Sequence, residues 1–159
     1  MKIFLTGPKN IGKSTVVLKV ITSFDKTVGF FTKKLKNSVL FIPIGKREKF
    51  FIGTMTKKGM VPCVNGFKKA IEFLKKLQFD DETLLVIDEL GFLERNQKPF
   101  LEIVEKSVLK AKKVLGVVRE DSLDFFPFLK DKDFTVIRVT KTNRDNLPKK
   151  VLKMLNGTL

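Results

Sequence analysis

The sequence predicts an α/β protein with a mainly parallel sheet, helices on its flanks and an inserted antiparallel hairpin. Segments with strand character alternate with segments of helical periodicity in both end regions of the chain, which is typical of a parallel sheet. The run at residues 83–87 (Thr-Leu-Leu-Val-Ile) is almost wholly apolar, as in a strand covered on both faces. Between residues 28 and 55, three β-like runs follow too closely for intervening helices, which predicts antiparallel pairing.

The first half of the chain is expected to hold four strands and two helices. A short apolar strand leads through a glycine-containing loop into a helix with Val16, Val17, Val20 and Ile21 on one face. The three β-like runs come next, and a second helix follows with apolar residues at core spacing. The expected ranges are strand 2–6, helix 13–23, β-like runs 28–33, 39–44 and 50–55, and helix 66–78.

The second half repeats a strand-helix alternation that ends in a helix. The expected ranges are strand 83–87, helix 98–111, strand 113–118, a short helical piece near 121–129, strand 134–139 and helix 143–155. In such sheets, ligands bind at the edge formed by the carboxyl ends of the strands. We therefore expect the functional residues directly after the strands.

Length and composition indicate a single domain over residues 1–159, with a hydrophobic fraction of 43% that suits a globular protein. No apolar run approaches the ~18 residues of a membrane span, and the N-terminus lacks the shape of a signal peptide. We therefore expect a cytoplasmic protein without a membrane partner, and a monomer.

The chain has one cysteine, Cys63, and no histidine. A single cysteine forms no internal disulfide, and a zinc site without histidine is not expected. Any catalytic metal should therefore be a hard ion such as Mg²⁺, held by oxygen ligands.

The formal net charge of +15 suits nucleic acid, anionic lipid or an anionic small substrate. The lysines come mostly as scattered doublets, and only five of the 32 basic residues are arginine. This pattern favours a solvated surface over a dedicated phosphate-clamping one. A nucleic-acid partner stays open as an alternative.

The strongest motif is the phosphate-binding loop G-x-x-x-x-G-K-[ST], placed between an expected strand and an expected helix. Its backbone N–H groups are suited to wrap a phosphate chain. Lys13 should reach the β- and γ-phosphates, and the Ser14 hydroxyl should ligate Mg²⁺. The residues of the motif are Gly7, Pro8, Lys9, Asn10, Ile11, Gly12, Lys13, Ser14 and Thr15.

A second acidic motif, Asp88-Glu89, ends the apolar run at 83–87. A carboxylate at the end of a buried strand can help to hold Mg²⁺ beside the phosphate loop, as Asp88 would. Glu89 is suited to activate a water that attacks the γ-phosphate, which favours hydrolysis over transfer to another acceptor. Because adjacent strand residues point to opposite faces, this role requires that the chain turns at Glu89.

Two further segments have both a structural and a functional interpretation. Thr142 and Asp145 have the spacing of a capping box for the last helix, whereas Asn143 and Arg144 could lie beside the base or sugar of a nucleotide. Arg119 follows a strand end and is interpreted as a surface residue, with a cis arginine finger as the alternative.

Four blocks of the sequence together resemble the small P-loop nucleoside-triphosphatase family, which is typified by thermophile enzymes and by the human cancer-related nucleoside-triphosphatase. The blocks at 29–32 and 143–145 are the specific ones, because generic P-loop proteins lack that combination. The blocks are residues 4–8 with 12–13, residues 29–32 (Gly-Phe-Phe-Thr), residues 86–91 (Val-Ile-Asp-Glu-Leu-Gly) with 94, and residues 139–140 with 143–145 (Asn-Arg-Asp).

The resemblance implies a RecA-like core with an inserted hairpin and Mg²⁺-dependent hydrolysis of several nucleoside triphosphates. By position, it implies phosphate and metal binding at Lys13 and Ser14, metal binding at Asp88, water activation at Glu89, and a place for Gly91 in the nucleotide site. The chain departs from the family at two positions within the span of these blocks, and its stretch 33–53 is shorter and richer in lysine than expected of relatives. Asn10 stands where a glycine is usual, and Asn tolerates left-handed backbone better than most residues. Phe92 stands where the family has a lysine.

These observations predict an enzyme that hydrolyses nucleoside triphosphates such as ATP and GTP to diphosphate and phosphate. Lys13 and Glu89 are the expected catalytic residues. A nucleotide or small-metabolite kinase is one alternative, although it needs an arginine-rich lid that five dispersed arginines hardly supply. A nucleic-acid-associated ATPase switch is the other.

Overall fold

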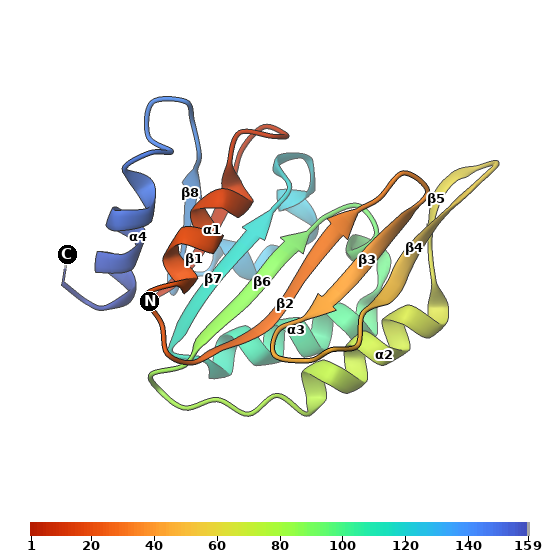
Figure 1. Cartoon of the computed structure of the whole chain (residues 1–159), viewed down its shortest axis with the longest axis horizontal. Coiled ribbons are helices and arrows are strands. Elements are labelled where there is room, and N and C mark those ends of the chain that lie inside the picture. Colours follow the sequence, from red (N-terminus) through yellow and green to blue (C-terminus); the bar gives the residue numbers. More distant parts are fainter. Residues whose placement is uncertain (159) are drawn as a thin grey trace.

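The computed structural model describes residues 1–158, in which eight strands form one sheet in the order β5-β4-β3-β2-β6-β7-β1-β8 (Figure 1). The strands are β1 Lys2–Thr6, β2 Thr27–Lys34, β3 Ser38–Pro43, β4 Phe50–Thr56, β5 Gly59–Pro62, β6 Leu84–Leu90, β7 Lys113–Val118 and β8 Phe134–Arg138. The α-helices are α1 Lys13–Ile21, α2 Val64–Lys75, α3 Lys98–Lys110 and α4 Leu147–Leu155. Short 3₁₀ helices span Glu94–Asn96, Glu120–Phe125 and Pro127–Lys130.

Helices cover both faces of the parallel part of the sheet, and each face has its own hydrophobic core (Figure 1). Helices α1 and α4 pack on one face, where Val17 and Val151 are fully buried. Helices α2 and α3 pack on the other face, over a cluster that includes Phe30, Phe41 and Phe100. Strand β6 lies between these layers with Leu84–Ile87 buried, so the expectation from its apolar run is confirmed.

The antiparallel part begins later and extends further than expected. Strand β2 pairs parallel with β6 and so belongs to the core sheet, and only β3, β4 and β5 extend it in antiparallel order. Strand β5 was not expected, because four residues bounded by Gly59 and Pro62 carry too little pattern. The predicted α/β class with an antiparallel insertion is confirmed, with these bounds corrected.

The last helix starts at Leu147, four residues later than the expected 143. The preceding turn is held by Thr140 and Asn143: the Thr140 amide donates to Asn143 Oδ1 at 2.8 Å, and the Asn143 amide donates to Thr140 Oγ1 at 3.2 Å. The capping box expected from Thr142 and Asp145 is therefore wrong, because the side chains that fix the backbone lie two residues earlier.

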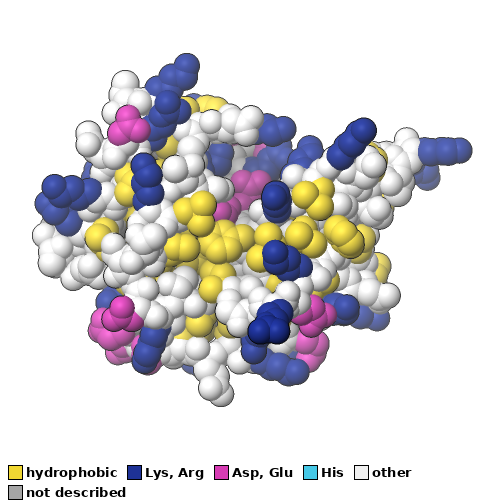
Figure 2. Space-filling model, in the orientation of Figure 1, with side chains coloured by type: hydrophobic (Ala, Val, Ile, Leu, Met, Phe, Trp, Pro, Cys, Tyr) yellow, Lys and Arg dark blue, Asp and Glu magenta, His cyan; other side chains and the backbone are white. Residues whose placement is uncertain are grey.

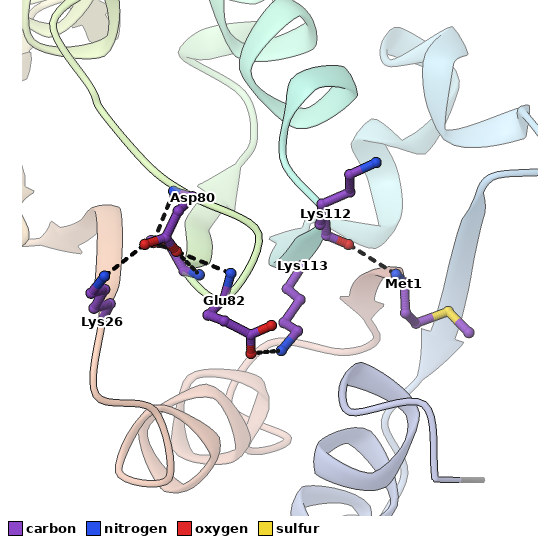
Figure 3. A network of polar contacts seen from close by, with 7 residues as sticks. Met1, Lys26, Asp80, Glu82, Lys112 and Lys113 are labelled. Carbon is purple, nitrogen blue, oxygen red and sulfur yellow. Dashed lines mark hydrogen bonds and ion pairs between the residues drawn. The ribbon is translucent and has the colours of Figure 1, made fainter.

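Polar contacts connect the chain segments at the amino-terminal ends of the parallel strands (Figure 3). Asp80 accepts a hydrogen bond from Lys26 Nζ at 2.6 Å and others from backbone amides of the loop before β6. The hydrogen bond from Lys26 is the main cause that lowers the pKa of the Asp80 carboxyl. Lys113 Nζ lies 2.8 Å from Glu82, and the Met1 ammonium donates to the Lys112 carbonyl at 2.9 Å. The contacts join the starts of β1, β6 and β7 to the end of the α1–β2 connection.

Within residues 1–158, none of the helices combines the length and the apolar character that a membrane crossing requires.

Candidate active site

The carboxyl ends of β1, β2, β6 and β7 meet at one edge of the sheet, where they and their loops line an open cavity of about 950 Å³. The sequence placed its candidates at this edge, and the structure brings most of them together there. Those that line the cavity are Gly7, Pro8, Lys9, Asn10, Gly12, Lys13, Ser14, Thr15, Asp88, Glu89 and Gly91.

The loop between β1 and α1 needs unusual backbone at three of its positions. Gly7 has φ +139°, and a Cβ there would lie 2.8 Å from the Val139 carbonyl oxygen. Gly12 has φ +115°. Asn10 has φ +61°, which is the left-handed conformation that asparagine tolerates best after glycine. The loop therefore keeps the form of a glycine-rich turn although asparagine occupies one of these three positions.

Lys13 opens α1 and turns back over the phosphate loop. Its ammonium donates to the carbonyl oxygens of Gly7 and Pro8, each at 2.8 Å, and its side chain is almost fully buried. Burial lowers the pKa of this ammonium, whereas the carboxyl groups of Glu89 and Asp88 oppose the shift. A cation is thus held at the centre of the loop, with two carboxyl groups close enough to interact with it.

Asp88 and Glu89 both line the cavity, although they are neighbours on β6. The register between β6 and β7 shifts between Asp88 and Leu90, so the regular alternation of side chains ends there. The peptide bond that joins Asp88 to Glu89 is cis. The Glu89 amide donates to Thr32 Oγ1 at 3.2 Å, which ties this irregular backbone to β2. The chain does not turn at Glu89 as the sequence analysis required, since β6 continues to Leu90, and Glu89 lines the cavity beside this register shift instead.

Burial dominates the electrostatics of both acids. It raises the pKa of Asp88 to about 7, with the Ser14 hydroxyl and Lys13 acting in the opposite direction. Burial also raises the pKa of Glu89, and Lys13 and Arg119 oppose that shift. A carboxyl group whose pKa moves toward neutrality is a better proton acceptor, which suits the role expected of Glu89.

Glu94 is a third buried acid of the cavity, and its side chain is only 4% exposed. Its Oε2 accepts a hydrogen bond from the Gly91 amide at 3.0 Å, so it holds the turn that follows β6. Gly91 leaves room for Arg119, because a Cβ at Gly91 would lie 2.8 Å from Arg119 Cδ. Glu94 therefore holds the backbone of Gly91, which lies close to both Glu89 and Arg119.

The ionisation of Glu94 should make stability depend on pH. Burial raises its pKa from 4.5 to about 7, so the folded protein prefers the protonated acid. The contribution of the protonated Glu94 side chain to the free energy of unfolding is complete below about pH 4.5 and is lost as the pH rises through about 7. Relative to the wild type, Glu94→Gln should gain roughly 1–3 kcal/mol of unfolding free energy between about pH 5 and about pH 8.

Circular dichroism is the suitable measurement for this comparison, because the chain has neither Trp nor Tyr. Glutamine can still accept the hydrogen bond from the Gly91 amide, so the substitution changes little besides the titration. A constant difference between the two proteins across this pH range would contradict the assignment.

Three predicted site residues do not line the cavity. Ile11 packs into the core beneath the phosphate loop. Arg144 lies against the outside of this loop, where its Nη1 donates to the Ile11 carbonyl at 3.3 Å. Asn143 donates from its side-chain amide to the Arg138 carbonyl at 2.9 Å. Both polar residues thus support the loop and the turn before α4, and their role beside a nucleotide stays a prediction.

The cavity is also lined by residues that the sequence analysis did not name as site residues. Thr32, Lys34, Val39 and Met60 come from β2, β3 and β5. Their contribution depends on how the antiparallel strands continue the sheet, and no local motif marks them. Only Thr32 had a signal, as the last residue of the Gly-Phe-Phe-Thr block.

Phe92, where the family resemblance implies a lysine, is 50% exposed and lines the cavity. Its ring lies 4.3 Å from the Arg95 guanidinium, which also contacts the Phe125 ring at 4.6 Å. The Arg95 guanidinium therefore places a positive charge against the Phe92 ring, although Phe92 itself is uncharged.

The oxygen donors of the cavity fit a Mg²⁺ ion that shares its ligands with phosphate. Within the described chain, no group of three or more His, Cys, Asp and Glu side chains is arranged to hold a metal alone. Ser14 and Asp88 nevertheless lie close enough for the hydroxyl to affect the pKa of the acid. Mg²⁺ is commonly bound by one or two protein oxygens together with substrate phosphates, which is what this pair provides.

Comparison with known proteins agrees with this geometry. The model of the family described as NTPase matches residues 2–152. Nucleoside-triphosphatase THEP1 of Natranaerobius thermophilus is 30% identical, and the match covers 99% of this chain and 97% of that protein. Nucleoside-triphosphatase THEP1 of Thermotoga petrophila is 28% identical over 98% of this chain and 93% of its own length.

Two solved structures share the fold. The crystal structure of THEP1 from Aquifex aeolicus has a TM-score of 0.82 at 22% identity, and covers 98% of this chain and 99% of that one. The solution structure of a human cancer-related nucleoside triphosphatase has a TM-score of 0.79 at 18% identity, with 99% and 98% covered. The predicted P-loop NTPase fold is confirmed by these likenesses. Because the family model matches residues 2–152 of this 159-residue chain, the chain belongs to the NTPase family.

Proposed function

We propose that the chain hydrolyses nucleoside 5′-triphosphates to diphosphate and phosphate in a Mg²⁺-dependent reaction with broad tolerance of the base. The observation that carries this proposal is the convergence of the phosphate loop, Asp88 and Glu89 in one cavity. Family membership supports it, since the relatives are named nucleoside-triphosphatases.

The residues of the cavity divide the work of hydrolysis between binding and proton transfer. Backbone N–H groups of the loop bind the phosphate chain, and the Lys13 ammonium reaches the β- and γ-phosphates. Ser14 and Asp88 would hold Mg²⁺, which neutralises charge on the phosphate oxygens when it is bound. Arg119 lines the same cavity and adds a further positive charge.

Glu89 orients the attacking water and accepts its proton. The water oxygen forms a bond to the γ-phosphorus while the bond from this phosphorus to the bridging oxygen breaks, and the electron pair leaves with the diphosphate. The raised pKa of Glu89 brings its proton affinity closer to that required at neutral pH.

Broad base tolerance follows from where the contacts fall. Backbone amides recognise phosphate and not base, and Asn143 and Arg144 bond to the protein's own backbone outside the lining of the cavity. We therefore expect similar turnover of purine and pyrimidine nucleotides.

The test is a phosphate-release assay over ATP, GTP, CTP and UTP, with Mg²⁺ and with a chelator in its place. Each nucleotide should release phosphate only with Mg²⁺, and Lys13→Ala should reduce the rate to background. Release that equals the Lys13→Ala background would overturn the proposal. Release from a single nucleotide would overturn its claim of base tolerance.

A further inference from the structure

The positive charge is concentrated in the part of the sheet formed by β2 to β5. Between Thr27 and Pro62 the chain has eight basic residues and a single acidic one, whereas the whole chain has 32 and 17. Most of these basic residues lie in the turns that rim the antiparallel strands. The basic residues are Lys33, Lys34, Lys36, Lys46, Arg47, Lys49, Lys57 and Lys58.

One face of this part of the sheet has no helix over it. Helices α2 and α3 cover the other face, and α1 and α4 lie over the parallel strands (Figure 1). Residues paired across antiparallel strands share a face, so the pairs Phe31–Ile42, Lys33–Leu40 and Leu40–Phe51 define the uncovered side. We call these five residues, Phe31, Lys33, Leu40, Ile42 and Phe51, the open face; Phe31 lies at its border, where it also packs against the core under α1 and α4.

The open face combines aromatic, aliphatic and basic side chains. Phe51 is 52% exposed, Phe31, Leu40 and Ile42 are partly exposed, and Lys33 is exposed. Figure 2 shows hydrophobic side chains gathered on this side of the molecule with Lys and Arg side chains among and around them. Flat strands that present phenylalanine beside lysine can stack unpaired bases and neutralise phosphates at once.

We propose that the open face binds single-stranded nucleic acid, with bases stacked on Phe51 and Phe31 and phosphates near Lys33 and the basic turns. A second copy of the chain is disfavoured as the occupant, because two surfaces with this charge repel each other. A membrane is disfavoured because the apolar side chains of the open face other than Phe51 are already partly buried.

The open face lies beside the candidate active site. Phe31 is the register partner of Asp88 on the neighbouring strand, about 4.8 Å away across the sheet. Nucleic acid on the open face would therefore lie next to the residues proposed to bind Mg²⁺. Binding is measured without nucleotide, so its outcome is independent of whether the chain hydrolyses triphosphates.

The test is fluorescence anisotropy with a labelled single strand of about a dozen uridines, titrated with the full chain at several salt concentrations. We expect binding, and we expect the logarithm of the association constant to fall linearly with the logarithm of the salt concentration. Phe51→Ala should weaken it about tenfold, and Lys33→Glu should weaken it and flatten the salt dependence.

Two matched controls separate the open face from general charge and general hydrophobicity. Phe125→Ala removes another exposed phenylalanine, and Lys106→Glu makes the same charge change on α3. Both variants should bind like the wild type, and circular dichroism should show that all four variants are folded. No binding at low salt would overturn the proposal, as would equal losses for Lys33→Glu and Lys106→Glu.

Two further probes test the choice of partner. A duplex of the same length should bind more weakly, because its bases are already stacked. In a co-sedimentation assay with vesicles that contain phosphatidylserine, the wild type and Phe51→Ala should not differ in the amount of protein bound. If the duplex binds equally, or if vesicle binding is the one that depends on Phe51, the open face is not a site for single strands.

Discussion

Glu89→Gln should reduce nucleoside-triphosphate hydrolysis by about 10²–10⁴-fold while nucleotide binding persists. The amide has nearly the same size as the acid but cannot accept the proton of the attacking water. Lys13 and the phosphate loop, which bind the substrate, are unchanged. The loss should therefore appear in kcat and leave the binding constant of a nonhydrolysable triphosphate within a few-fold of the wild-type value.

A matched control for this variant is Glu120→Gln, which makes the same change at another glutamate of the cavity. Glu120 begins a 3₁₀ helix after β7 and has no assigned part in proton transfer, so turnover should survive. Phosphate release and titration of the nonhydrolysable nucleotide measure the two properties separately. Full turnover in Glu89→Gln would show that another group activates the water.

Gly29→Ala should destabilise the fold by about 3 kcal/mol or more, which corresponds to a fall in Tm on the order of 10 °C. Gly29 has φ +115°, and a Cβ there would lie 1.9 Å from the carbonyl oxygen of Val86 on β6. This contact is with backbone in the centre of the sheet, so no side-chain movement can relieve it. Thermal unfolding followed by circular dichroism measures the change.

Gly59→Ala separates the two contributions to this effect. Gly59 also has a positive φ, +98°, but a Cβ there would meet no atom within 4 Å. Its substitution should therefore show the conformational cost alone, about 1 kcal/mol. If the two variants lose similar stability, the close approach of β2 to β6 is not what requires glycine at position 29.

The parts of the fold that the sequence predicted are those with strong local patterns. The phosphate loop has fixed offsets, β6 is an apolar run, and α1, α2 and α3 show helical periodicity. The resemblance to the nucleoside-triphosphatase family added the block around Gly29, whose physical basis is the contact just described. None of these features depends on the exact register between strands.

What the sequence did not predict depends on register and pairing. Strand β5 exists because β4 offers it a pairing edge, and its own four residues carry little preference. Glu89 reaches the cavity through a register shift that no residue pattern marks. Val39 and Met60 enter the cavity only because β3 and β5 continue the sheet. Such features follow from tertiary structure and cannot be inferred from local propensity.

The outermost strand, β5, also bears on how the protein behaves at high concentration. A sheet edge with unpaired N–H and C=O groups can recruit another chain and start fibril growth. Here the edge strand has only four residues, ends in Pro62 and follows the charged turn of Lys57 and Lys58. Short length, proline and lysine are the features that natural sheets use against such pairing. We therefore expect this edge of the sheet to resist pairing with another copy of the chain.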